Sequence, residues 1–289
     1  MEIRKLDIPL CMVGEGPVWD VEEQALYLVD VFGKKVHRHD PASGANQSWN
    51  VPSLIGSMAI RQSGGAIVAL VDGLYSLEFK TGEIKPLAMP EGLDPRIQFN
   101  DGKVDRRGRF VVGSADSKLK EPVGSIYVFD KDQSLTVIDT GIGLSNGPCW
   151  SPDDKTFYFS DSMRHMIYTY DYDIETGKAV NRREWVNTKE LGGIPDGATV
   201  DADGLLWMAI CEGSKVVAFR SDGKVERVID MPVRFVSSVM FGGPDLDLLY
   251  VTSIDTRAAG LPPEPDAGST FVVEGLGTRG LPEPRYISR

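Results

Sequence analysis

The sequence has few of the features that mark membrane proteins, secreted proteins or nucleic-acid-binding proteins. None of its apolar runs approaches the roughly 18 residues of a membrane-spanning helix, and its N-terminus, MEIRKLDIPL, lacks the apolar core of a signal peptide. Its 42 acidic side chains outnumber 31 basic ones, giving a net charge of −11, and no lysine and arginine cluster stands out. We therefore expect neither a membrane nor a nucleic acid as a partner.

Cysteine and histidine are also scarce. The three cysteines, Cys11, Cys149 and Cys211, lie far apart and show no CxxC spacing. This pattern argues against a disulfide framework and a structural zinc site, and it fits a reducing cytoplasm. Cys149 and Cys211 lie in apolar runs and are expected to be buried. The histidines at positions 37, 39 and 165 are expected at the surface, which disfavours a histidine-based mechanism.

Short β-rich runs make up much of the chain instead. Six runs rich in β-branched and aromatic residues are bounded by turn residues, which is the signal for strands. They cover residues 25–31, 65–71, 108–114, 155–161, 205–210 and 247–253. No long segment with a helical period of 3.6 residues competes with them, so we predict an all-β fold.

The runs belong to a repeat with a period of about 40 to 50 residues. Another β-rich run follows each one, and a short triplet precedes it, at residues 18–20, 59–61, 103–105, 149–151, 199–201 and 239–241. Each unit then holds roughly four strands, which is typical of a β-propeller blade. Six units predict a six-bladed β-propeller, and no linker divides residues 1–289, so we predict a single domain.

Two segments outside the repeat also have expected positions in a propeller. Residues 2–7 are expected to complete the C-terminal blade and close the ring of blades. The proline-rich connection 255–268 is expected to cover one mouth of the central channel.

One column of the aligned repeat carries candidate metal ligands. The position four residues before the middle of each triplet holds Glu15, Gly56, Asn100, Asn146, Asp196 and Val236. Because the innermost strands of a propeller surround its channel, these positions should form a circle at one mouth. The four polar residues supply only oxygen ligands, which suits Ca²⁺, Mg²⁺ or Mn²⁺, with Zn²⁺ as an alternative. Asn-Gly and Asp-Gly are also common turn pairs, so a turn role is the competing interpretation.

Several phrases in the chain carry a resemblance to a known family. They are GEGPVWD (14–20), FNDGKVDRRGRF (99–110), SNGPCWSPDDKTFYFSDS (145–162), IPDGATVDADGLLWMA (194–209) and FGGPDLDLLYVTS (241–253). The set resembles the senescence marker protein (regucalcin)/gluconolactonase/luciferin-regenerating enzyme family over nearly the whole chain. The resemblance implies a six-bladed propeller with one divalent metal in its channel.

The resemblance also implies roles for individual residues. Glu15, Asn146 and Asp196 match the family's metal ligands, and Asn100 matches its substrate-contacting asparagine near the metal. Asp196 matches the general base as well. The family's typical activity is hydrolysis of sugar lactones to sugar acids, supported by calcium, zinc, manganese or magnesium.

The predicted substrate wall departs from the family pattern. Gln98 stands where many members have an arginine that binds sugar hydroxyls, and Ala115 stands where methionine is common. Arg96, two residues before Gln98, and Lys118, near the position of a substrate-contacting glutamate, are the candidates to replace the lost arginine. A solvated loop position is the alternative for Lys118.

These observations lead to one leading hypothesis and two alternatives. The leading hypothesis is a cytoplasmic metal-dependent lactonase that acts on a small cyclic ester, with a sugar aldonolactone as substrate, calcium as the favoured ion and Asp196 as general base. The first alternative is a hydrolase of a non-sugar lactone or an organophosphate-type ester. The second is a metal-binding propeller without catalysis. The sequence does not predict an oligomeric state.

Overall fold

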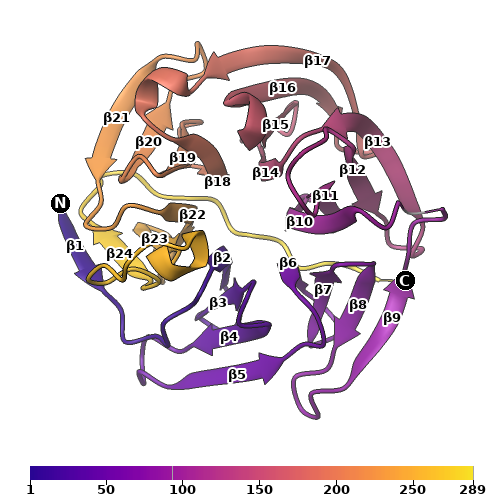
Figure 1. The fold of residues 1–289 in the computed structure, drawn as a ribbon, viewed down its shortest axis with the longest axis horizontal. Coiled ribbons are helices and arrows are strands. Elements are labelled where there is room, and N and C mark those ends of the chain that lie inside the picture. Colours follow the sequence, from indigo (N-terminus) through magenta and orange to yellow (C-terminus); the bar gives the residue numbers. More distant parts are fainter. Residues whose placement is uncertain (93, 289) are drawn as a thin grey trace.

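Six four-stranded antiparallel sheets stand around a central axis in the computed structural model, which describes residues 1–92 and 94–288 (Figure 1). The predicted all-β, six-bladed β-propeller is confirmed. The described residues contain no α-helix. They contain three short 3₁₀ helices, η1 (Ser162–Arg164), η2 (Lys189–Leu191) and η3 (Thr256–Ala259). None of the described helices has the length and apolar character needed to cross a membrane.

Five of the sheets are formed by consecutive strands, from the innermost strand at the channel to the outermost (Figure 1). They consist of β2 (Gly14–Asp20), β3 (Ala25–Asp30), β4 (Lys35–His39) and β5 (Asn46–Asn50); β6 (Ile55–Ile60), β7 (Ala66–Leu70), β8 (Leu74–Leu77) and β9 (Ile84–Ala88); β10 (Ile97–Val104), β11 (Phe110–Asp116), β12 (Gly124–Phe129) and β13 (Leu135–Ile142); β14 (Ser145–Trp150), β15 (Thr156–Asp161), β16 (Met166–Asp173) and β17 (Lys178–Asn187); and β18 (Ile194–Val200), β19 (Leu206–Cys211), β20 (Lys215–Phe219) and β21 (Val225–Asp230).

The sixth sheet joins the two ends of the chain. It contains β22 (Val236–Gly242), β23 (Leu248–Ser253), β24 (Phe271–Glu274) and, as its outermost strand, β1 (Glu2–Lys5). β1 pairs with β24 from Glu2 opposite Glu274 to Lys5 opposite Phe271. The prediction that the N-terminus closes the ring is confirmed. The pairing covers an edge of β24 that would otherwise expose unpaired backbone groups.

The hydrophobic core is divided into clusters that lie between neighbouring sheets. The cluster between the fifth and sixth sheets, for example, joins Trp207 of β19 to Phe241 of β22 and Leu249 of β23. Because both faces of a sheet are covered, β3 and β19 are buried at every position and do not alternate. The outermost strand β21 is exposed at five of its six positions. Strands at the same position in different sheets therefore have similar surroundings. This is why the repeated units could be aligned in the sequence.

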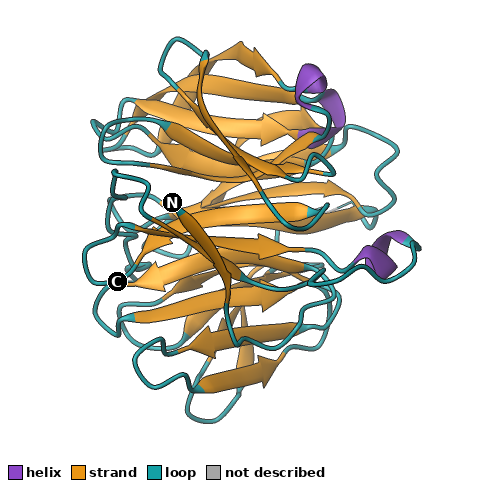
Figure 2. Cartoon of the chain, turned by 90° about the vertical axis from the view of Figure 1, so that its left-hand side faces the viewer, coloured by secondary structure: helices purple, strands orange, loops and turns teal. Residues whose placement is uncertain are grey.

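The two mouths of the channel differ. The chain from residue 275 to residue 288 crosses one face of the propeller, seen as the yellow segment near the centre of Figure 1. It is held there by bridges from Gly280 to Asp201 and from Tyr286 to Arg61. The short helices lie at the opposite face from the C-terminus (Figure 2). The mouth on the helical side is therefore the open one.

The prediction that the histidines lie at the surface is wrong for two of them. His37 and His39 on β4 are only 3% and 5% exposed. The segment between β1 and β2 packs against this part of the first sheet, where Asn46 Nδ2 donates to the carbonyl of Asp7. The sequence pattern of the strands did not indicate that the segment between β1 and β2 covers β4, the third strand of the first sheet.

Candidate functional site

A cavity of about 410 Å³ lies at the open mouth of the channel and gathers the polar residues of the repeat column. Its lining includes four residues that we call the oxygen ring: Glu15 of β2, Asn100 of β10, Asn146 of β14 and Asp196 of β18. Each lies in the first half of an innermost strand, so strands far apart in the sequence bring these side chains to one place.

A β-bulge in each innermost strand shapes this mouth. The pairing of β2 with β3 shifts register after Glu15, and β14 and β18 shift after Asn146 and Pro195. Gly16 and Gly147, which follow two of the oxygen-ring residues, have φ angles of 49° and 59°, a region that favours glycine. Bulges change the direction of side chains and are common beside active sites. They explain why glycine accompanies the polar residue in this column.

A chain of hydrogen bonds fixes the amide of Asn146. The Ser162 hydroxyl donates to the carbonyl of Pro195 at 2.6 Å, so its oxygen is an acceptor for Asn146 Nδ2, which lies 2.9 Å away. The amide nitrogen of Asn146 must therefore face Ser162. Its oxygen Oδ1 is left on the side of the oxygen ring, where a ligand atom is required.

Asn100 is oriented in a similar way. Its Nδ2 donates to the carbonyl of Ser145 at 2.7 Å and to Asn146 Oδ1 at 2.9 Å. Both hydrogens of its amide are used, so its oxygen is the group that remains for a ligand.

The two carboxyl groups of the oxygen ring strongly disfavour ionisation when no cation is present. Burial raises the pKa of Glu15 well above its ordinary value, and the nearby Asp196 raises it further. Burial also raises the pKa of Asp196 well above its ordinary value, and the charge of Asp101 adds to this. Glu15 keeps some surface at the cavity, whereas Asp196 is only 6% exposed. The charged pair is therefore unstable without a counter-charge.

Asp101 is a third buried carboxylate that the sequence reasoning missed. Its Oδ1 accepts from the backbone N–H of Gly102 at 2.8 Å, and its Oδ2 accepts from that of Gly147 at 2.9 Å. Burial raises its pKa, and Lys103 lowers it in part. Asp101 holds the residue that follows Asn146. The signal in the sequence that could have identified Asp101 is its place in the Asn-Asp-Gly triplet at residues 100–102.

These properties fit a bound divalent cation. The donors are carboxylate and amide oxygens, and among the described residues that line the cavity none is basic. Glu15, Asn146 and Asp196 present three such oxygens, a donor set that hard cations prefer. A cation would supply the missing counter-charge for the buried carboxylates.

The predicted substrate residues divide into two groups. Gln98 lines the cavity beside Asn100 on β10. Arg96 is exposed and makes an ion pair with Asp94 at 2.6 Å, and Lys118 is exposed as well. Neither Arg96 nor Lys118 lines the cavity. Over residues 1–92 and 94–288, the structure therefore brings no basic side chain to the place of the family arginine.

Apolar side chains form much of the cavity wall above the oxygen ring. They include Val13, Phe32, Leu54, Phe235 and Ile254. Phe32 is 51% exposed, so its ring stands at the mouth. Ala258 and Ala259 of η3 also line the cavity, which agrees with the expected position of the connection 255–268.

Cys211 lies beside the oxygen ring. It is buried, as expected, but it also lines the cavity next to Asp196. Burial raises the pKa of its thiol well above the ordinary value, and Asp196 raises it further. The group is therefore a neutral thiol, which argues against a role as nucleophile.

Comparison with known proteins places the chain in a family. The model described as the SMP-30/gluconolactonase/LRE-like region matches residues 13–255. Regucalcin from Xenopus laevis is 36% identical over 281 residues, which cover 93% of both chains. The pentonolactonase XacC from Haloferax volcanii is 36% identical over 281 residues, covering 95% of this chain and 94% of that protein.

A solved structure agrees over a similar length. The crystal structure of a calcium-binding protein, regucalcin, from Agrobacterium tumefaciens superposes with a TM-score of 0.91 at 27% identity, covering 99% of this chain and 97% of that one. The motifs, the fold and these matches agree, and the chain belongs to the SMP-30/gluconolactonase/LRE family of lactonases and their relatives.

Proposed function

We propose that this protein is a metal-dependent lactonase that hydrolyses a small cyclic ester, with a sugar aldonolactone as the leading substrate class. The oxygen ring at the bottom of an otherwise largely apolar cavity is the observation that supports this proposal. The relative named pentonolactonase and the gluconolactonase in the family's description support the reaction class and the choice of a lactone.

Glu15, Asn146 and Asp196 would hold the cation, and calcium is our favoured ion. A bound divalent cation polarises the ester carbonyl and keeps the surrounding carboxyl groups ionised. Glu15 balances the charge, and its carboxylate is held by the backbone N–H of Gly16 at 3.0 Å. Asn146 contributes a neutral oxygen whose direction is fixed through Ser162.

Asp196 is the proposed general base. It accepts a proton from the water that attacks the carbonyl carbon, and a bond forms between that carbon and the water oxygen. The bond to the ring oxygen then breaks, and Asp196 returns the proton to this oxygen as the hydroxyl of the product. Asn100, whose amide hydrogens are committed to Ser145 and Asn146, presents its oxygen to a substrate hydroxyl.

The test is release of acid from a lactone panel, followed with a pH indicator on chelator-treated protein. Five-carbon and six-carbon aldonolactones, an aliphatic lactone and a phosphotriester are each assayed with Ca²⁺, Mg²⁺, Mn²⁺ or Zn²⁺ added back. We expect metal-restored turnover of an aldonolactone and a loss of at least about 100-fold in Asp196→Asn. The exposed residue Asp245 provides a matched control, and Asp245→Asn should keep wild-type activity.

Calorimetric titration of the same variants with the activating ion separates two reasons for lost activity. If the Asp196→Asn variant still binds the ion but does not hydrolyse the substrate, the base role of Asp196 is supported. Metal binding by the wild-type protein without turnover of any substrate in the panel would refute the lactonase proposal and favour a metal-binding propeller without catalysis.

A second candidate substrate is a lactone with few hydroxyl groups. The apolar wall favours it, as does the lack of a basic side chain among the described residues that line the cavity with Gln98. On this candidate, Phe32→Ala should lower kcat/KM for the aliphatic lactone about 5-fold to 30-fold through lost apolar contact, and change that for an aldonolactone less. Equal losses for both substrates would count against it.

A further inference from the structure

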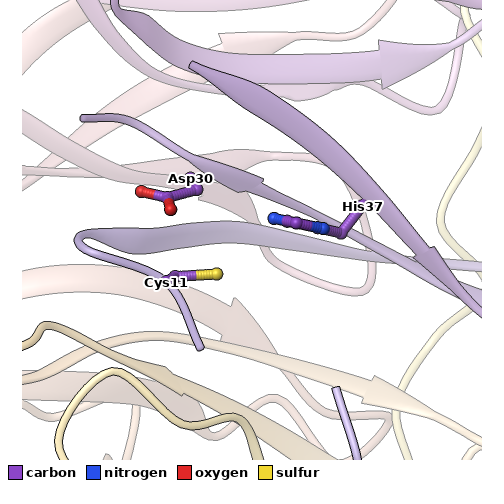
Figure 3. Close-up of side chains that lie close together, drawn as sticks. All are labelled: Cys11, Asp30 and His37. Atoms are coloured by element: carbon purple, nitrogen blue, oxygen red, sulfur yellow. The ribbon is translucent and has the colours of Figure 1, made fainter. Parts of the chain in front are cut away.

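A second group of potential ligands lies away from the oxygen ring. Cys11, Asp30 and His37, which we call the seam cluster, each offer one ligand atom, and these atoms lie within 4.8 Å of one another. All three side chains are buried, with 2%, 5% and 3% exposure. Figure 3 shows the sulfur of Cys11 and the ring of His37 directed toward a common space beside Asp30.

His37 carries the main sign that this cluster binds something. Its Nδ1 lies 2.7 Å from Ser48 Oγ, while its Nε2 is buried and has no hydrogen-bond partner among the residues that the structure describes. A buried polar atom without a partner destabilises the fold, because it has lost its hydrogen bonds to water and gained none in return. With Nδ1–H donating to Ser48, Nε2 keeps a lone pair that faces the cluster. Metal-bound histidines commonly have this arrangement, in which the second ring nitrogen donates to a nearby oxygen.

Asp30 is held in place and still has a free acceptor position. Its Oδ1 accepts from the backbone N–H groups of Val13 and Gly33, and its Oδ2 accepts from that of Met12 at 3.0 Å. A carboxylate oxygen accepts about two hydrogen bonds, so Oδ2 has one position left for another partner.

We propose that Cys11, Asp30 and His37 form a second metal site, selective for a borderline-soft divalent ion such as Zn²⁺. One sulfur, one nitrogen and one oxygen donor are typical zinc ligands, whereas the oxygen ring suits a hard cation. Ligand atoms around a tetrahedral zinc lie roughly 3.3–3.8 Å apart, given metal–ligand distances of about 2.0–2.3 Å. Because the ligand atoms lie within 4.8 Å of one another, metal binding would draw them together by at most about 1 Å. A water, or the carbonyl of Pro9 at 3.7 Å from the Cys11 sulfur, would complete the four ligands.

The position of the seam cluster indicates what the metal would do. Cys11 belongs to the segment that joins the ring-closing strand β1 to β2, and it packs at the seam between the sixth and first sheets. Asp30 and His37 belong to the first sheet. A metal would therefore link this segment to the first sheet. It would also fix the chain just before Val13 and Glu15, which line the cavity.

Cobalt(II) absorbance tests the site directly, because Co²⁺ replaces Zn²⁺ and a cobalt–thiolate bond gives a charge-transfer band in the near ultraviolet. The protein is first saturated with Ca²⁺ to occupy the oxygen ring. We expect one equivalent of Co²⁺ to give this band in the wild-type protein and in Cys211→Ser, and no band in Cys11→Ser. Cys211 is the informative control, because its thiol lies beside the oxygen ring. Loss of the band in Cys211→Ser but not in Cys11→Ser, or no band at all, would overturn the proposal.

Thermal unfolding provides the second measurement. Zinc at about 100 times its Kd should raise the Tm of the calcium-saturated protein by about 4 °C. The rise should be absent in His37→Gln and retained in His39→Gln, a matched control because His39 is a buried histidine on the same strand. Metal-free Tm values show whether each variant is folded. An equal rise in His37→Gln and His39→Gln would contradict the assignment.

Discussion

The stability of the metal-free protein should fall as the pH rises above the ordinary carboxyl pKa of about 4. Glu15 and Asp196 have pKa values raised well above the ordinary range because both carboxyl groups are buried close together. The folded protein therefore keeps protons that the unfolded chain releases near the ordinary carboxyl pKa. The stability that these protons provide is complete below that pKa and is lost as the pH approaches the raised values.

The expected size follows from one retained proton. Each proton that only the folded state holds changes the free energy of unfolding by about 1.4 kcal/mol per pH unit. A chain of 289 residues has an unfolding entropy near 0.6 kcal/mol per degree at about 60 °C. The Tm of the metal-free protein should then fall by about 2 °C per pH unit over the range in which the folded protein keeps this proton. Calcium and protons compete for the same carboxylates, so the Tm increase caused by saturating calcium should grow with pH.

Differential scanning calorimetry of chelator-treated protein at several pH values, with and without calcium, measures both effects. Glu15→Gln should make the metal-free slope shallower. Glu190→Gln, a change of the same kind at an exposed position, should leave it unchanged. Parallel Tm curves with and without calcium, or a wild-type slope in Glu15→Gln, would refute the claim that these two carboxyl groups hold an extra proton.

Two further predictions concern the scaffold. Asp105→Ala should lower the free energy of unfolding by about 2–4 kcal/mol in denaturant titrations, because it removes the 2.7 Å ion pair of buried Arg109, leaving the 3.3 Å pair with Asp130, and removes the acceptor of Tyr172. A loss below about 1 kcal/mol would contradict this. Deletion of residues 1–5 should lower the free energy of unfolding by about 2–4 kcal/mol, because the edge of β24 becomes exposed. The same exposure should promote aggregation, which light scattering detects. A monomeric variant of wild-type stability would show that β1 is not needed for closure.

The sequence predicted the oxygen ring because a propeller repeats one geometry. Once the triplets are aligned, Glu15, Asn100, Asn146 and Asp196 must occupy equivalent positions at the channel, and the structure places all four in one cavity. The roles assigned to them stay predictions until metal binding and turnover are measured. Gln98 also lines the cavity, because it lies on the same strand as Asn100.

Residues outside the repeated positions could not be placed in this way. Arg96 precedes β10, and its side chain pairs with Asp94 instead of entering the cavity. Lys118 follows β11 in an exposed turn. The direction of a side chain in a connection depends on local partners, which periodicity does not describe.

Asp101 shows a different limit. A strand pattern assigns adjacent residues to opposite faces. The bulge after Phe99 interrupts that alternation, and Asp101 becomes buried beneath the oxygen ring. A register shift of this kind depends on the pairing of two strands, so it is not visible in either strand alone.

The sequence by itself determined the all-β fold, the six blades and the column of oxygen-bearing side chains, because each depends on a local pattern repeated at a fixed spacing. The closing strand at the N-terminus lies outside the repeat and was predicted from the way propellers close. Only the tertiary structure decided which side chains turn into the cavity, how the amides of Asn100 and Asn146 are oriented, and that Cys11 meets Asp30 and His37. Contacts of this second kind join segments that share no periodic relation. They follow from how the sheets pack around the channel and how the chain ends cross them.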